Sequence, residues 1–278
     1  MQIIPCQNNL ELATKIAAIK GFELIIPTIN FFSGQEIQIT IPKILGKEVY
    51  IIQSFSASVN DALIELLLTI NAARNSGADI INVIAPYLGY SRQDKIEAFK
   101  SHGLGMIANL LSSCTINQLI TIDFHSPVAL NLFSIPITNI SPQDLILPLT
   151  KNKVIITPDN GASRRNNFDN VIQLNKKRID GNLHFELNGD VAGQDCLVVD
   201  DIIDSGKTIC QASEILITNG AKSVKAYVTH ALFSSGTRHR ITNSFISKLY
   251  ISNSITTNFL PRNALVIDIS NTLAKNIL

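Results

Sequence analysis

Acidic and small polar residues gather in the stretch 196–216, CLVVDDIIDSGKTICQASEIL. The apolar run Cys196–Val199 is typical of a buried parallel strand, and Asp200 and Asp201 follow it. Ligands of parallel α/β sheets bind beyond the carboxyl ends of the strands, so we expect both carboxylates to face a ligand. A helical apolar pattern starts at Ile209.

The residues before that helix suit a phosphate. Gly206 lets the backbone approach an anion closely, and successive N–H groups at a helix N-terminus bind anions. Lys207 adds positive charge. The sequence therefore predicts a sugar-phosphate site, with hydroxyls bound by the acid pair and the phosphate bound by Ser205, Gly206, Lys207 and Thr208, which follow Asp204.

Two other interpretations explain less of this stretch. Asp204 or Ser205 could simply cap the helix, but a cap does not account for two further acids at the end of a buried strand. A Walker-type P-loop requires a second glycine five positions before Gly206, and position 201 is aspartate.

Further polar clusters come directly after other predicted strands. They are Tyr87–Lys95 (YLGYSRQDK), Asp123-Phe124-His125 and Asp159-Asn160-Gly161. Each has a simpler explanation by itself, such as a surface pair between Arg92 and Asp94, or a hydrogen-bonded core histidine at His125. Together, their cations and acids suit a polyphosphate with Mg²⁺.

The segment Asn175–Asn188 is polar and basic, and it is long for a connection between two strands. It could be disordered. Lys176, Lys177 and Arg178 within it could instead close over an anion.

Composition limits the classes of function. The chain has 278 residues, 46% hydrophobic and 16% charged, which is enough for two ordinary domains and hints at a buried subunit interface. A net charge of +1 predicts no attraction to nucleic acid or to an anionic membrane. Four widely spaced cysteines suggest thiols in a reducing compartment, and no apolar stretch has the length of a membrane span, so we expect a cytoplasmic protein.

An internal repeat indicates the domain organisation. Residues 49–85 run strand, polar loop, helix, Asn-Ser-Gly-Ala, strand, and residues 196–229 run strand, acidic loop, helix, Asn-Gly-Ala, strand. The pattern predicts two tandem α/β halves, residues 1–141 and 142–278. Gln53-Ser54 replaces the acid pair in the first half.

Hydrophobic patterning predicts the main elements. Strands are expected at 2–4, 23–26, 49–52, 80–85, 118–122 and 154–157, helices at 8–19 and 60–74, and a hairpin within 31–40.

Taken together, these motifs resemble the ribose-phosphate pyrophosphokinase (phosphoribosyl pyrophosphate synthetase) family. The resemblance runs from about residue 31 to 273 through FFSGQE, GKEVYIIQS, NDALIELLLTINA, PYLGYSRQDK, DFHS, TPDNG and VVDDIIDSGKT. It implies two phosphoribosyltransferase-like domains, each a mostly parallel sheet flanked by helices. It also implies transfer of the β,γ-diphosphoryl group of ATP to the 1-hydroxyl of ribose 5-phosphate, giving phosphoribosyl pyrophosphate and AMP, with Mg²⁺.

The resemblance also implies residue roles. Asp200 and Asp201 would contact the ribose hydroxyls, and Asp204–Thr208 would hold the 5-phosphate. The remaining implied positions are Arg92, Gln93 and Asp94 for ATP, Phe32 and Glu36 for the adenine of a neighbouring subunit in a homo-oligomer, His125 and Asp159 for ATP–Mg²⁺, and Lys176 and Arg178, with Asn182, on the catalytic loop.

Two alternatives compete with this resemblance. A type I phosphoribosyltransferase shares the acidic loop but has no use for two α/β halves or for Arg92-Gln93. A non-catalytic regulatory homologue would be expected to lose part of the basic segment or of the acid pair, and this chain has both.

Overall fold

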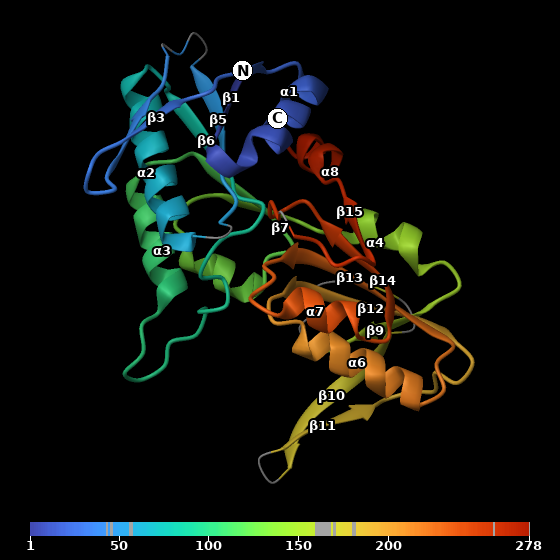
Figure 1. Cartoon of the computed structure of the whole chain (residues 1–278). Coiled ribbons are helices and arrows are strands. Elements are labelled where there is room, and N and C mark those ends of the chain that lie inside the picture. The colour runs from blue at the N-terminus through green and yellow to red at the C-terminus, as the bar shows by residue number, and fades with distance from the viewer. Residues whose placement is uncertain are drawn as a thin grey trace. The chain divides into compact units, whose positions relative to one another are not determined.

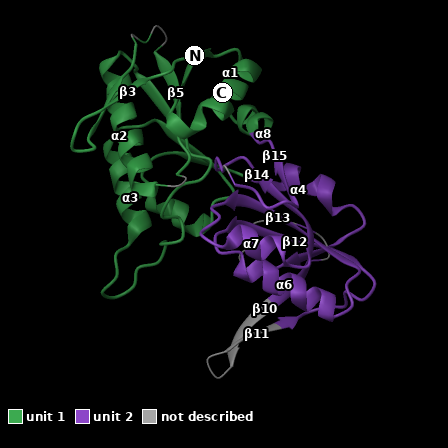
Figure 2. Cartoon of the chain, viewed as in Figure 1, with its two compact units in different colours: residues 1–140, 270–278 green, residues 141–269 purple. Residues whose placement is uncertain are grey.

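The chain forms two compact units (Figures 1 and 2). The computed structural model describes residues 1–42, 44, 47–55, 58–158, 168, 171–179, 182–257 and 259–277, with the backbone alone at 175–179 and 182–185. Unit 1 comprises Met1–Ile140 and Ser270–Leu278, and unit 2 comprises Ser141–Ile269. No helix among the described residues is long and apolar enough to cross a membrane.

Unit 1 is built on a parallel sheet with the strand order β2-β1-β5-β6-β7-β8. Its strands are β1 (Gln2–Pro5), β2 (Glu23–Leu24), β5 (Glu48–Ile52), β6 (Ile80–Ile84), β7 (Gln118–Ile122) and β8 (Ile137–Ile140). Short runs of isoleucine and valine make the central strands almost fully buried, as expected for a sheet covered on both faces.

Helices flank this sheet. They are α1 (Leu10–Lys20), α2 (Val59–Asn75), α3 (Gly103–Ser113) and α8 (Ser270–Lys275), with short 3-10 turns η1 (Gln7–Asn9) and η2 (Pro127–Leu132). Gly21 ends α1 in the left-handed conformation (φ 67°), and its N–H donates to Ala17 O. A separate antiparallel hairpin, β3 (Thr28–Phe31) and β4 (Ile37–Thr40), lies between β2 and β5 in the chain.

The end of the chain packs in unit 1. Helix α8 contacts α1 (Figure 1), and Lys20 Nζ donates a hydrogen bond of 2.6 Å to Ile277 O. Leu273 and Ala274 are buried there. The domain division at 141/142 stays a prediction, and the compact units differ from it in assigning residues 270–278 to unit 1.

Unit 2 has the strand order β11-β10-β9-β12-β13-β14-β15, parallel except for the antiparallel pair β10–β11. The strands are β9 (Val154–Thr157), β10 (Val171–Ile179), β11 (Asn182–Leu187), β12 (Asp195–Ile203), β13 (Ser223–Ala231), β14 (Ile246–Ser252) and β15 (Ala264–Ile267). The helices are α4 (Gln143–Thr150), α6 (Lys207–Thr218) and α7 (Thr237–Thr242).

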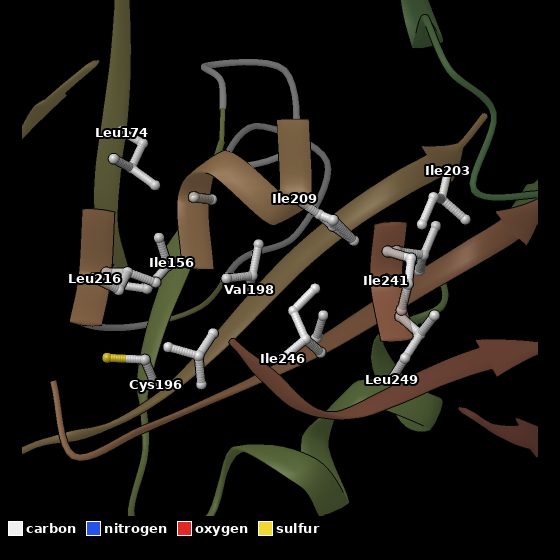
Figure 3. Packing of buried hydrophobic residues seen from close by; sticks show 14 of the residues in the cluster. Ile156, Leu174, Cys196, Val198, Ile203, Ile209, Leu216, Ile241, Ile246 and Leu249 are labelled. Atoms are coloured by element: carbon white, nitrogen blue, oxygen red, sulfur yellow. The ribbon is translucent and has the colours of Figure 1, made fainter. Parts of the chain in front are cut away.

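Two hydrophobic clusters cover the faces of this sheet. Helices α6 and α7 pack on one face, where Ile209, Leu216 and Ile241 join Val198 and Ile203 of β12 (Figure 3). Helix α4 packs on the other face through Ile146, which joins a cluster with Leu197, Val199 and Tyr227. Along residues 196–199, alternate side chains of β12 therefore contribute to opposite clusters, as strand geometry requires.

The two sheets repeat one order. The arrangement β2-β1-β5-β6-β7-β8 corresponds, strand for strand along the chain, to β10-β9-β12-β13-β14-β15. This agrees with the predicted tandem α/β halves, in which β5–α2–β6 corresponds to β12–α6–β13.

Two local predictions were wrong. Asp200 and Asp201 do not follow strand β12 but lie within it, because Ile202 and Ile203 continue the ladder by pairing with His230 and Ala231. The segment 175–188 is not a long connection, because residues 175–179 pair with residues 182–186 as the ribbon β10–β11.

Candidate functional site

The acid pair lies where β12 passes the end of its neighbour β9. Asp201 is 4% exposed, Asp200 is half-buried, and the Asp201 N–H donates to Asp200 Oδ1 at 3.0 Å. Val198 pairs with Ile156, one residue before β9 ends, so both acids extend beyond the carboxyl end of β9. This is the edge of a parallel sheet at which ligands bind.

The predicted phosphate loop follows directly. Gly206 has φ 72° and precedes the first residue of α6, and its carbonyl accepts from Cys210 N at 3.1 Å. Lys207 is exposed, whereas Asp204, Ser205 and Thr208 are half-buried. Neither Ser205 N–H nor Gly206 N–H donates to any of the described residues, which leaves both amides available to an anion at the helix N-terminus.

The basic residues of β10 extend beyond the same edge. Gln173 pairs with Thr157, the last residue of β9, so the backbone at Lys176 and Arg178 continues past that strand's end. Strands β10 and β12 flank β9, and at the usual strand spacing their backbones lie about 10 Å apart. Asn182 begins β11, where it pairs with Ile179. The structure thus brings the acids and the basic segment to one edge of unit 2, while Asp159 lies outside the described residues.

The predicted ATP residues of unit 1 follow β6. Arg92 and Gln93 are exposed and Asp94 is half-buried. Gln93 is held at its backbone: its N–H donates to Tyr90 O at 2.8 Å, and its carbonyl accepts from Leu104 N at 3.2 Å.

His125 follows β7, the parallel neighbour of β6, so its segment and the one that carries Arg92–Asp94 leave the sheet at the same edge. It is half-buried. Asp123, two positions earlier, is buried with φ 48°, a conformation that non-glycine residues rarely adopt. Backbone strain of this kind is found more often at functional sites than elsewhere, so Asp123 is a candidate that our predicted set did not include.

Phe32 and Glu36 close the β3–β4 hairpin. Phe32 N donates to Glu36 O at 2.9 Å, and both side chains are exposed, Phe32 at 52%. A half-exposed aromatic ring at the tip of a hairpin is suited to stacking on a planar partner such as a base.

Known proteins match this chain along most of its length. Residues 1–114 match the N-terminal domain of ribose phosphate pyrophosphokinase, and residues 151–278 match the phosphoribosyl synthetase-associated domain. A ribose-phosphate pyrophosphokinase of Granulibacter bethesdensis is 33% identical over 271 residues, covering 92% of this chain and 87% of that protein. One of Bacillus caldolyticus is 35% identical over 270 residues, covering 92% and 86%. The chain belongs to the ribose-phosphate pyrophosphokinase family.

A solved structure shows the same fold. The crystal structure of phosphoribosylpyrophosphate synthetase from Mycobacterium smegmatis superposes with a TM-score of 0.89 at 24% identity, covering 99% of this chain and 96% of that one. The α/β prediction with two phosphoribosyltransferase-like domains is therefore confirmed for this member of the ribose-phosphate pyrophosphokinase family.

In the first half of this family member, Gln53 and Ser54 stand at the position of the acid pair, and both form hydrogen bonds inside the protein. Gln53, fully buried after β5, accepts from Asn9 Nδ2 at 3.0 Å and donates to Glu65 Oε2 at 3.0 Å. Ser54 N donates to Asn9 Oδ1 at 3.2 Å. Among the described residues of this loop, these polar groups are therefore bonded to one another inside the protein.

Sequence reasoning also missed the segment after β13. Ser234 N and Thr237 Oγ1 both donate to Asp204 O, at 3.1 and 2.7 Å, and Arg240 Nη1 donates to Ser205 O. Burial raises the pKa of the nearby Cys210 thiol, and a hydrogen bond with Ser244 and the charge of Arg240 oppose the shift. The only sequence signal was the Ser/Gly-rich run FSSGT at the end of a predicted strand.

The donor set is compatible with Mg²⁺. Within the described ranges, no three His, Cys, Asp or Glu side chains gather as metal ligands. Mg²⁺ usually takes one or two protein carboxylates and completes its shell with waters and substrate phosphates. Such a site needs fewer than three protein carboxylates, and Asp159, the carboxylate predicted for it, lies outside the described residues.

Proposed function

We propose that the protein is a ribose-phosphate diphosphokinase, which transfers the β,γ-diphosphoryl group of ATP to the 1-hydroxyl of ribose 5-phosphate and releases AMP. The observation that carries this proposal is the match to ribose-phosphate pyrophosphokinases over 92% of the chain. The acid pair and the anion-binding loop at one edge of unit 2 support it.

Ribose 5-phosphate would bind to unit 2. Its phosphate would take hydrogen bonds from the amides of Asp204–Thr208, and Lys207 would add a charge-assisted contact. Its hydroxyls would donate to Asp200 and Asp201, since ionised carboxylates only accept hydrogen bonds. This arrangement leaves the anomeric hydroxyl free to react.

ATP would be bound by residues from more than one segment. Arg92 and Gln93, with Asp94, would contact the nucleotide from the segment after β6. Phe32 and Glu36 would reach the adenine from a neighbouring copy in a homo-oligomer, a role for which exposed side chains on a hairpin tip are suited.

The reaction would be an in-line displacement. The anomeric oxygen of ribose 5-phosphate attacks the β-phosphorus of ATP, the bond between that phosphorus and the oxygen bridging to the α-phosphate breaks, and the electron pair leaves with AMP. Such chemistry depends on positioning and on charge stabilisation. Lys176 and Arg178 would supply positive charge to the transferred group.

His125 and Asp159 would hold Mg²⁺ together with the phosphates of ATP. When bound, the metal would neutralise charge on the phosphate oxygens and orient the β-phosphorus. We also propose a cytoplasmic location, for which the four free thiols of Cys6, Cys114, Cys196 and Cys210 give support.

A direct assay tests the activity. The purified protein is incubated with ATP, Mg²⁺ and ribose 5-phosphate, and AMP and phosphoribosyl pyrophosphate are quantified. We expect the two products in equal amounts, and no AMP when ribose 5-phosphate is omitted. Absence of AMP with every nucleoside triphosphate would instead favour the non-catalytic regulatory homologue.

A further inference from the structure

Successive backbone carbonyls behind the phosphate loop are all bonded to one segment. Ile203 O accepts from Leu232 N at 2.9 Å. Asp204 O accepts from Ser234 N at 3.1 Å and from Thr237 Oγ1 at 2.7 Å. Ser205 O accepts from Arg240 Nη1. We call Ser234, Thr237 and Arg240 the carbonyl clamp.

The clamp determines where the loop amides point. In a trans peptide the C=O and the following N–H are directed oppositely across the plane. Because the carbonyls of Asp204 and Ser205 are directed at the clamp, the N–H groups of Ser205 and Gly206 are directed away from it. Neither amide donates to a described residue, so both are available on the side of the loop where an anion would bind.

Packing fixes the clamp against the loop. Thr237 is fully buried and Arg240 is half-buried. A Cβ at Gly206 would lie 3.1 Å from Thr237 Cγ2 and 3.2 Å from Ile241 Cδ1, so α7 directly contacts the loop. Ile241 is itself part of the hydrophobic cluster with Ile203 and Ile209 (Figure 3), which holds α7 in place.

Arg240 adds an electrostatic effect. A guanidinium bonded to a carbonyl polarises that peptide, so the N–H on its other side becomes a stronger donor. The peptide in question joins Ser205 to Gly206. The charge of Arg240 therefore acts on the anion through the peptide.

We propose that Thr237 and Arg240 are positioning residues for the 5-phosphate of ribose 5-phosphate, acting by aiming the Ser205 and Gly206 amides at it. This inference rests on the proposed function and deepens it. It predicts a specific loss: weaker binding of ribose 5-phosphate, with ATP binding unchanged.

Thr237 is tested by an isosteric pair. Thr237→Val removes the hydroxyl donor and keeps the shape, and Thr237→Ser keeps the donor. By isothermal titration of ribose 5-phosphate, we expect Thr237→Val to weaken binding about fivefold to tenfold, the effect of one hydrogen bond. Thr237→Ser should bind within about twofold of wild type, and the KM for ATP should not change in either variant.

Arg240 is tested with a charge-matched control. Arg240→Gln should weaken binding of ribose 5-phosphate about tenfold or more, because the lost hydrogen bond is charge-assisted. Arg238→Gln removes the same charge from an exposed position on the same helix and should bind like wild type. Thermal unfolding of each variant shows whether it is folded, and Arg240→Gln decides the question if Thr237→Val does not fold.

Different results would overturn the role of the carbonyl clamp and the proposed diphosphokinase activity. Wild-type turnover with unchanged ribose 5-phosphate affinity in Thr237→Val and Arg240→Gln would overturn the clamp and leave the diphosphokinase intact. Equal losses of affinity for ribose 5-phosphate and for ATP would also overturn it. So would binding of ribose 5-phosphate by Thr237→Ser that is as weak as by Thr237→Val, because either result would show a general structural role. A wild-type protein that neither binds ribose 5-phosphate nor forms AMP would overturn the proposed function itself.

Discussion

In the proposed mechanism, Lys176 and Arg178 would bring positive charge to a reaction that needs little else from side chains. A diphosphoryl group in transfer spreads negative charge over its oxygens, and preorganised cations stabilise that charge more in the transition state than in the ground state. The backbone at both positions runs past the end of β9, the same edge at which Asp200 and Asp201 lie. We therefore expect their loss to affect turnover more than binding.

Replacement of Lys176 tests this expectation. Lys176→Ala should lower kcat by about 100-fold or more while the KM values for both substrates change little, because the charge acts on the transition state. Lys177→Ala changes the basic neighbour to which the family resemblance assigns no role, so it is the matched control and should retain most of the turnover. Steady-state kinetics with intact turnover and raised KM in Lys176→Ala would show that the residue only binds substrate.

Residue identity at the site could be predicted only where the signal is local. Asp200 and Asp201 stand beside a buried apolar run and a glycine, so a short window of sequence was enough to suggest a sugar phosphate. Thr237 and Arg240 touch the same loop from more than 30 positions away, and threonine and arginine are common on surfaces. Their contact depends on β12 and β13 being neighbours, which only the fold shows.

At the scale of elements, the turn from β12 into α6 depends on Gly206. Its φ of 72° lies in the left-handed region, and the space beside it is occupied by Thr237 and Ile241 of α7. A side chain there would meet both backbone strain and a tight contact that α7 must shift to relieve.

Gly206→Ala should lower the free energy of unfolding by about 2 kcal/mol or more and weaken ribose 5-phosphate binding. Gly193→Ala is the control, because Gly193 has φ 70° but no atom within 4 Å of the position that a Cβ would take. It should cost about 1 kcal/mol, from strain alone, and leave binding unchanged. Urea unfolding and titration of ribose 5-phosphate measure both effects; equal losses in the two variants would exclude a contribution from α7.

Elements were predictable where apolar runs are short and bounded. Strands β7 and β9 agree with the predicted 118–122 and 154–157, since each is a β-branched run between polar turns. The end of β12 was not predictable, because two consecutive acidic residues are typical of a turn. The strand continues past them because Ile202 pairs with His230 of β13, a contact that only the fold shows. The ribbon β10–β11 was hidden for the same reason: its basic residues suggested a loop, whereas pairing such as Leu174 with Leu187 makes a strand.

For the whole molecule, the two sheets repeat one strand order and differ in what is inserted. In unit 1 the hairpin β3–β4 lies in the chain between β2 and β5, the strand that precedes α2. In unit 2, β11 lies at the corresponding place, between β10 and β12, the strand that precedes α6. The proposed adenine contacts lie on the first insertion, and the proposed catalytic cations lie on β10, beside the second. The repeat thus places both sets of proposed ATP-facing residues at corresponding points of the chain.

If the hairpin serves a neighbouring copy, inactive variants should complement each other. Phe32→Ala and Lys176→Ala, each weakly active alone, are co-expressed with different tags and purified as a mixture. If the two variants pair at random as dimers, half of the dimers contain one chain of each kind. In such a dimer one of the two sites has both Lys176 and the neighbouring Phe32, so roughly a quarter of wild-type activity should return. Activity no higher than the mean of the separate variants would place Phe32 in the site of its own chain, and sedimentation velocity confirms that the mixed species form.

The most direct test of diphosphoryl transfer follows phosphorus through the reaction. In ³¹P NMR of the protein with ATP, Mg²⁺ and ribose 5-phosphate, the three ATP resonances should be replaced, one for one, by AMP and by the two diphosphate signals of phosphoribosyl pyrophosphate. No ADP should appear. Formation of ADP with a singly phosphorylated sugar, or of free pyrophosphate in place of the sugar diphosphate, would contradict attack of the anomeric hydroxyl on the β-phosphorus.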